Sequence, residues 1–191
     1  MKERRSDSNT RQSYALLLID VINDLEFPSG RKLYQHAMPA ARRIAVLKRR
    51  AQAKGVPVVY VNDNFGQWRS DFRQQVEHCQ QENALGRELT QLLRPSPEDY
   101  FVLKPKHSGF FSTTLDLLLT HLGATRLILT GFSSEICVLY TANDAYMRDF
   151  EIFVPQDCVA AETRRGNSTA LQQMERWLKA DIRDSSKIRF S

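Results

Sequence analysis

Residues 126–140 read RLILTGFSSEICVLY, and this stretch decides the fold. Its first part, RLILTG, is a short apolar run that predicts a strand buried on both faces. The polar turn FSSE follows and leads into a helix predicted from about Glu135 to Met147. Cys137 therefore lies near the beginning of a helix, where a buried strand has just ended.

Four further apolar runs occur along the chain, and helical patterns separate most of them. The alternation of strands and helices indicates a doubly wound, three-layer α/β/α fold with a mostly parallel sheet of five or six strands. Ligands bind such sheets at the carboxyl ends of the strands. The other strands are predicted at 14–20, 56–61, 100–103 and 151–155, and the other helices at 36–54, 84–93, 115–122 and 167–179.

The 191 residues are 42% hydrophobic, which is enough for one domain with a sizeable core. We expect a disordered basic arm at 1–12, the domain at 13–182 and a C-terminal tail at 183–191. Residues 1–12 and 179–191 each hold four basic and two acidic groups, so the ends carry most of the net charge of +5. The body lacks the broad basic face that binds phosphate backbones, so a nucleic-acid partner is not expected.

The three cysteines are odd in number and widely spaced, which predicts neither a disulfide framework nor a zinc ribbon and suits the reducing cytoplasm. The longest aliphatic stretch, Ala15 to Ile19, is far too short for a bilayer, so no membrane partner is expected. The glycine-rich nucleotide motifs GxGxxG and GxxxxGK[ST] do not occur, and the four histidines are scattered. We therefore predict no cofactor and no metal.

Three reactive side chains follow predicted strands. Asp20 ends the first strand, Lys104 follows the third, and Cys137 follows the fourth, so they supply a base, an electrostatic partner and a nucleophile. The helix beginning and Lys104 would favour the Cys137 thiolate, and nearby backbone N–H groups could hold an oxyanion. Taken singly, each has another interpretation: a buried small cysteine, a capping aspartate and a solvated lysine.

Three segments resemble the isochorismatase-like cysteine hydrolases, which include nicotinamidases and N-carbamoyl amide hydrolases. They read LLLIDVINDL (16–25), VLKPKHSGFFSTTLDLLL (102–119) and LILTGFSSEICVLYTANDAYMRDFEIFVPQDC (127–158), within a resemblance that covers about residues 14–163. The resemblance implies a catalytic triad of Asp20, Lys104 and Cys137. It also implies an oxyanion hole formed by the backbone amides of Ser133 and Cys137, a cis peptide between Phe132 and Ser133, and a homo-oligomer, either a dimer or a tetramer.

The sequence departs from the family pattern at two places. Nicotinamidases hold a metal through a D-x-H motif, whereas the matching residues here are Asp63, Asn64 and Phe65, which supports the expectation that no metal is bound. Ile22 and Leu25 replace the Gln and Phe of the family's D-x-Q-N-D-F motif, which alters the lining of the pocket.

The partner that we expect is a small-molecule substrate. The chemistry that the resemblance implies, and that a cysteine at position 137 favours over the alternatives, is hydrolysis of a C–N bond in a small amide, carbamoyl or ureido compound, through a thioester on Cys137. The alternatives are vinyl ether hydrolysis of the isochorismatase type and a non-catalytic binding or assembly module on the same fold. Asn23 and Asp24 are predicted to orient Asp20. The predicted substrate contacts are Asn64, Phe65, Trp68, Phe110 and Tyr140. Phe110, Tyr140 and one of the two loop aromatics could equally be core or interface packing.

Overall fold

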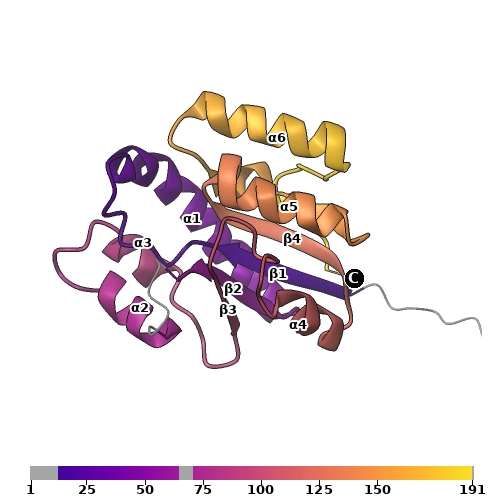
Figure 1. Cartoon of the computed structure of the whole chain (residues 1–191), viewed down its shortest axis with the longest axis horizontal. Helices are drawn as coiled ribbons and strands as arrows, with labels where there is room; N and C mark the ends of the chain where they lie inside the picture. The colour runs from indigo at the N-terminus through magenta and orange to yellow at the C-terminus, as the bar shows by residue number, and fades with distance from the viewer. Residues whose placement is uncertain (1–12, 65–70, 191) are drawn as a thin grey trace, which may run out of the picture.

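The protein is described by a computed structural model that covers residues 13–64 and 71–190 (Figure 1). Its centre is a parallel sheet of six strands in the order β3-β2-β1-β4-β5, with β6 beside the end of β4. This sheet confirms the predicted α/β fold. The strands are β1 (Ser13–Ile19), β2 (Val58–Asp63), β3 (Tyr100–Lys104), β4 (Ala124–Phe132), β5 (Glu151–Phe153) and β6 (Val159–Ala160).

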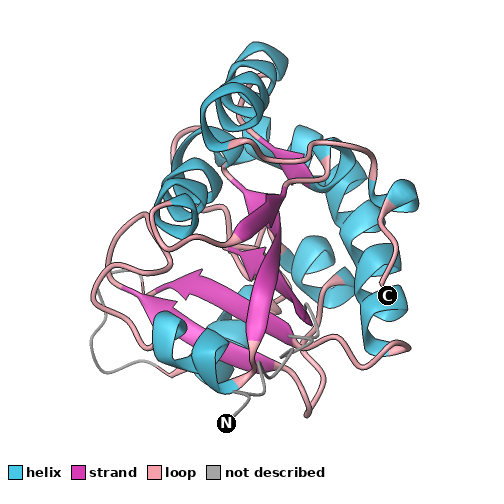
Figure 2. Cartoon of the chain, turned by 90° about the vertical axis from the view of Figure 1, so that its right-hand side faces the viewer, coloured by secondary structure: helices cyan, strands magenta, loops and turns pink. Residues whose placement is uncertain are grey.

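Helices lie on both sides of the sheet, as Figure 2 shows. The predicted helix at 36–54 begins earlier, at Gly30, and the predicted helix at 84–93 is shorter. The helix Phe72–Cys79 and the two-residue strand β6 were not predicted. The helices are α1 (Gly30–Gln52), α2 (Phe72–Cys79), α3 (Arg87–Leu92), α4 (Leu115–His121), α5 (Leu139–Tyr146) and α6 (Arg164–Leu178), with the short helical turns η1 (Ser134–Val138), η2 (Gln156–Cys158) and η3 (Ser185–Lys187).

Strand β1 separates two apolar cores because its successive side chains point to opposite faces. Leu16 and Leu18 pack in the core that contains the buried residues of α1 to α3. Leu17 and Ile19 pack in the core of α4, α5 and α6. All four side chains are completely buried, which explains why this strand is apolar on both faces rather than alternating.

The strand order places a ligand-binding position at the end of β1. The chain runs from β1 outward through β2 to β3 and then returns to the other side of β1 as β4. The order reverses between β1 and β4, and in open α/β sheets ligands bind at the carboxyl ends of the strands at such a reversal. Asp20 follows β1 and Ser133 follows β4 at this point.

The segment after residue 182, predicted to be a tail, is packed against α1. The Arg50 guanidinium donates to the carbonyls of Ser185 and Ile188 at 2.8 and 2.6 Å, and Ile188 is 3% exposed. The packed structure therefore continues past the predicted boundary. The predicted arm at 1–12 lies outside the described residues. Among the helices of 13–64 and 71–190, none combines the length and the apolar character needed to cross a membrane.

Candidate active site

Asp20 is the first residue after β1, and its backbone turns there with φ 51°. This left-handed conformation is uncommon outside glycine, although aspartate tolerates it better than most residues. The side chain is buried, and its Oδ1 accepts a hydrogen bond of 2.7 Å from the backbone N–H of Asp63. The carboxylate is thus held at the end of β1 by the end of the neighbouring strand β2.

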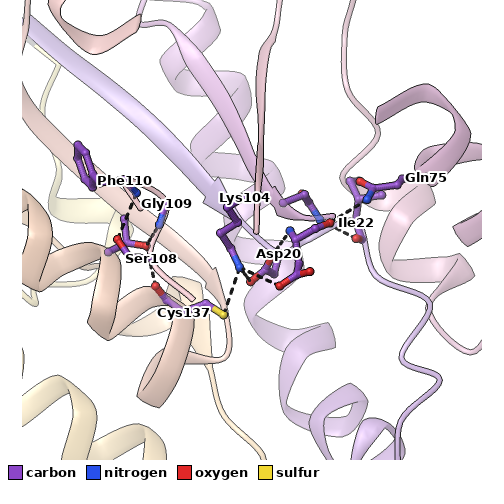
Figure 3. A network of polar contacts seen from close by, with 11 residues as sticks. Asp20, Ile22, Gln75, Lys104, Ser108, Gly109, Phe110 and Cys137 are labelled. Atoms are coloured by element: carbon purple, nitrogen blue, oxygen red, sulfur yellow. Dashed lines mark hydrogen bonds and ion pairs between the residues drawn. The ribbon is translucent and has the colours of Figure 1, made fainter. Parts of the chain in front are cut away.

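Lys104, the last residue of β3, lies at the centre of the site (Figure 3). Its side chain is completely buried, and its Nζ lies 2.9 Å from Oδ2 of Asp20. The same Nζ lies 3.5 Å from the Sγ of Cys137 and 3.5 Å from Oδ2 of Asp63. One ammonium group therefore joins the two other residues of the predicted triad, which the structure brings together.

Cys137 lies in η1, a single wide helical turn of the π type between β4 and α5. Turns of this kind occur often at functional sites. Its half-buried thiol makes side-chain hydrogen bonds with both Asp20 and Lys104. The three groups form one connected set from three different elements of the chain.

Lys104 favours the Cys137 thiolate, as predicted, but two other effects act against it. Burial, followed by the negative charge of Asp20, raises the pKa of the Cys137 thiol, and the opposing effect of Lys104 does not offset this rise. A raised thiol pKa means that a base has to accept the proton when Cys137 reacts.

Burial also affects the pKa values of Asp20 and Lys104. It raises the pKa of Asp20 above the usual carboxyl range, although Lys104 and the hydrogen bond from Asp63 act in the opposite direction. Burial alone would lower the pKa of Lys104, but Asp20, Cys137 and Asp63 together raise it. The site therefore holds a permanently charged ammonium beside a carboxylate that is a stronger base than an exposed one.

The peptide bond between Phe132 and Ser133 is cis, as the resemblance implied. Just before it, Gly131 has φ 116°, and a Cβ there would lie 2.0 Å from the carbonyl oxygen of Ile19. Glycine thus permits β4 to approach β1 closely where the strand ends. Ser133 comes directly before η1, so its backbone and that of Cys137 belong to the same turn.

The predicted substrate contacts lie in different surroundings. Asn64 is buried, and its N–H donates to the carbonyl of Lys104 at 3.0 Å. Phe110 is buried in the core of α4 to α6 and packs against Phe150, whereas Tyr140 is 53% exposed beside His107. Phe65 and Trp68 lie outside the described residues.

Asn23 and Asp24, predicted to orient Asp20, make other contacts. Asn23 Oδ1 accepts from the backbone of Leu25, and Asp24 Oδ2 lies 3.1 Å from Nε2 of His78. Asp24, Glu26 and His78 form a group whose ligand atoms lie within 4.8 Å of one another and could hold a metal ion, among the residues that the structure describes. The motif position used by nicotinamidases does not fit a metal, because Phe65 offers no ligand atom and Asp63 faces Lys104.

Sequence analysis missed the part that Asp63 plays at the site. Its N–H holds the Asp20 carboxylate, and its own carboxylate faces Lys104. Asp63 is the last residue of its strand, as Lys104 is of β3, so the same signal is present in the sequence. It was interpreted only as part of an incomplete metal motif.

The parallel sheet, the buried carboxylate and ammonium, and the half-buried thiol define an α/β protein with the groups of a hydrolytic site. Residues 14–185 match the family model of the isochorismatase domain. The chain is also 39% identical over 174 residues to the isochorismatase family protein YaaI of Bacillus subtilis, covering 91% of this chain and 95% of that protein. The chain therefore belongs to the isochorismatase family and is a hydrolase.

Two further relatives have names that describe their reactions. N-carbamoylsarcosine amidase of Thermoplasma acidophilum superposes with a TM-score of 0.72 at 28% identity, covering 94% of this chain and 100% of that one. Ureidoacrylate amidohydrolase RutB of Methylorubrum extorquens is 35% identical over 85 residues, which is 44% of this chain and 33% of that protein. The second similarity thus spans about a third of that protein's length.

Proposed function

We propose that this protein hydrolyses a C–N bond of a small amide, carbamoyl or ureido compound, with Cys137 as the nucleophile. The observation that carries the proposal is the buried set in which Lys104 Nζ lies 2.9 Å from Asp20 and 3.5 Å from the Cys137 sulfur. A nucleophile within reach of a base, with a fixed charge beside both, is the arrangement that covalent hydrolysis needs. Two relatives named for carbamoyl or ureido substrates support the substrate class.

In the first half of the reaction, the Asp20 carboxylate accepts the proton of the Cys137 thiol while the sulfur attacks the substrate carbonyl carbon. The π electrons of the carbonyl move to its oxygen, and the backbone N–H groups of Ser133 and Cys137 stabilise the oxyanion. When this intermediate collapses, the C–N bond breaks and the nitrogen leaves with the proton from Asp20. An acylated or carbamoylated Cys137 and free ammonia or amine remain.

In the second half, Asp20 accepts a proton from a water molecule as the water oxygen attacks the thioester carbon. The C–S bond breaks, the acid or carbamate departs, and Asp20 returns its proton to the sulfur. Lys104 keeps its proton throughout, because Asp20, Cys137 and Asp63 raise its pKa. Its positive charge opposes the negative charge that moves between Asp20 and the sulfur.

The test combines ammonia release with intact mass. Wild-type protein, Cys137→Ala and Cys158→Ala are incubated with N-carbamoylsarcosine, N-carbamoylglycine and nicotinamide, and samples are quenched in acid. Cys158 is a matched control because it is another cysteine, buried in η2 away from the set. We expect ammonia release and an acyl adduct with wild type and Cys158→Ala, and neither with Cys137→Ala.

Two outcomes would contradict the proposal. Ammonia release by Cys137→Ala at the wild-type rate would exclude the covalent route. If no amide reacts and iodoacetamide labels Cys137 no faster than Cys79 and Cys158, then vinyl ether hydrolysis or a non-catalytic role would explain the fold better.

We also propose that the enzyme works in the cytoplasm as a dimer or tetramer. The three free cysteines suit a reducing compartment. Leu117, Met147 and Trp177 are 74%, 78% and 64% exposed, and apolar side chains of this size are typical of subunit interfaces. Sedimentation velocity tests the assembly, and a single monomeric boundary at micromolar concentration would contradict it.

A further inference from the structure

One buried hydroxyl joins the loop behind Lys104 to the residue that carries the nucleophile. The backbone N–H of Gly109 donates to Oγ1 of Thr141 at 3.0 Å, and this Oγ1 donates to the carbonyl oxygen of Cys137 at 2.7 Å. Figure 3 shows Gly109 beside Cys137 within the polar network of the site. Thr141 is completely buried, so water does not compete for these bonds.

Close packing supports the bond between the loop and α5. A Cβ on Gly109 would lie 2.8 Å from Cγ1 of Val61 and 3.1 Å from Cδ2 of Leu115, so the loop fits here because residue 109 is glycine. A second polar contact follows almost one turn further along α5, where the hydroxyl of Ser108 donates to Asp144. The loop is thus attached to α5 at two places on the same helix.

The sheet alone joins Lys104 to Cys137 only indirectly. Lys104 ends the edge strand β3, and β2 and β1 lie between it and β4, the strand that leads to Cys137. Small changes in twist across three strand pairs would add up at the 3.5 Å contact between Nζ and Sγ. The hydrogen bonds of Thr141 instead connect the loop after Lys104 directly to Cys137.

We propose that Thr141 is a positioning residue, whose hydroxyl holds the Cys137 turn against the lysine loop and so fixes the separation of Nζ and Sγ. A threonine hydroxyl often donates to the carbonyl four residues earlier in a helix, and that bond alone would carry no such role. The role rests on the second bond, in which the same oxygen accepts from Gly109. The proposal depends on the proposed function because it takes Cys137 to be the nucleophile.

The test measures how fast iodoacetamide labels Cys137 across a range of pH, by intact mass, in Thr141→Val, Thr141→Ser and Thr130→Val. Valine has the shape of threonine without the hydroxyl, and serine restores the hydroxyl. Thr130 is the matched control, because it is also completely buried and its hydroxyl donates to the carbonyl of Leu17 at 2.9 Å within the sheet.

We expect Thr141→Val to label about 10-fold more slowly at fixed pH, with the midpoint of the pH profile shifted upward, because the thiolate reacts and its fraction falls about tenfold for each pH unit by which the midpoint rises. The shift follows because Lys104, which lowers the pKa of the Cys137 thiol against Asp20, would lie further away. Thr141→Ser and Thr130→Val should label within about 2-fold of wild type. If the hydroxyl served only to stabilise the fold, Thr141→Val would open the structure and Cys137 would be labelled faster.

An unchanged profile in Thr141→Val, or an equal shift in Thr130→Val, would overturn the proposal. If Thr141→Val does not fold, Ser108→Ala tests the second attachment in the same assay, with a smaller upward shift expected and an unchanged midpoint counting against it. The readout needs no substrate. If Cys137→Ala still releases ammonia, the proposed function fails, while the labelling profiles still decide whether Thr141 positions the sulfur.

Discussion

Replacing Lys104 by methionine removes the positive charge from the centre of the site while keeping an unbranched side chain of similar length. At the 2.9 Å separation of Lys104 and Asp20, the attraction between unit charges is about 6 kcal/mol at an effective dielectric constant of about 20. The energy that both charges lose by leaving water offsets part of this attraction. Removing one partner of a buried pair costs about 3–5 kcal/mol, a large share of a typical folding free energy of about 5–15 kcal/mol.

The loss of stability in Lys104→Met depends on pH in a defined direction. Without the ammonium, the pKa of Asp20, already raised by burial, rises further in the folded protein. The folded protein then binds this proton more tightly than the unfolded chain does, so stability falls as pH rises above the unfolded pKa of about 4. The loss is therefore small at about pH 4 and becomes complete above the folded pKa of Asp20 in the variant.

Urea unfolding of four proteins at about pH 4.5 and about pH 8 measures these changes. They are wild type, Lys104→Met, Lys104→Met with Asp20→Asn, and Lys48→Met, whose lysine forms another buried pair, 2.7 Å from Asp99. We expect the double variant to recover most of the stability at the higher pH. Lys48→Met should lose stability but keep ammonia release per folded molecule, whereas Lys104→Met should lose both.

The reasoning would be refuted by an equal loss in Lys104→Met at both pH values, because the cost would then not come from the charge of Asp20. A double variant as unstable as Lys104→Met at about pH 8 would refute it in the same way.

Further predictions concern the base, the other thiols and the C-terminal segment. Asp20→Asn should lower ammonia release by about 100-fold or more, because Asp20 is the proposed base. It should also speed iodoacetamide labelling at neutral pH, because Asp20 raises the pKa of the Cys137 thiol, and slower labelling would contradict this electrostatic effect. Cys79 and Cys158 are completely buried, and burial raises the pKa of both thiols, that of Cys79 to about 12. Native wild-type protein should therefore gain one iodoacetamide label in intact mass, and three labels would contradict this. Arg50→Met should lose about 1–3 kcal/mol in urea unfolding and speed hydrogen exchange in the segment after residue 184; unchanged exchange would show that the two guanidinium bonds do not hold it.

The sequence predicts most of the sheet because its central strands, β1, β2 and β4, are almost entirely buried. The run at 14–19 is continuously apolar, and a run of this kind between helices has few other interpretations. The region at 62–99 was harder to predict, because α2 and α3 are short and mostly polar on their exposed sides. The two-residue strand β6 carries no periodic signal at all, since its existence depends on pairing with the end of β4.

The features of the site also divide into ones that the sequence predicts and ones that it does not. Asp20, Lys104 and Cys137 are predictable because each lies at or shortly after the carboxyl end of a strand, and the fold brings these ends together. Thr141 is not, because a threonine four residues after Cys137 in a helix has the same local pattern whether or not a loop donates to it. The rise in the pKa of the Cys137 thiol is not predictable either, since the depth of burial is a tertiary property.

Burial explains both why the Cys137 thiol holds its proton tightly and why that proton passes to Asp20 when the sulfur reacts. One ammonium, Lys104, faces the carboxylates of Asp20 and Asp63, so releasing the Cys137 proton to water would add uncompensated negative charge to a desolvated site. Passing that proton to Asp20 leaves the total charge of the set unchanged. Because burial raises the pKa of both Asp20 and Cys137, each holds a proton more tightly than in water, and passing the Cys137 proton to Asp20 requires less energy than releasing it to water. Attack by the sulfur and proton transfer to Asp20 are therefore coupled within one buried set of charges.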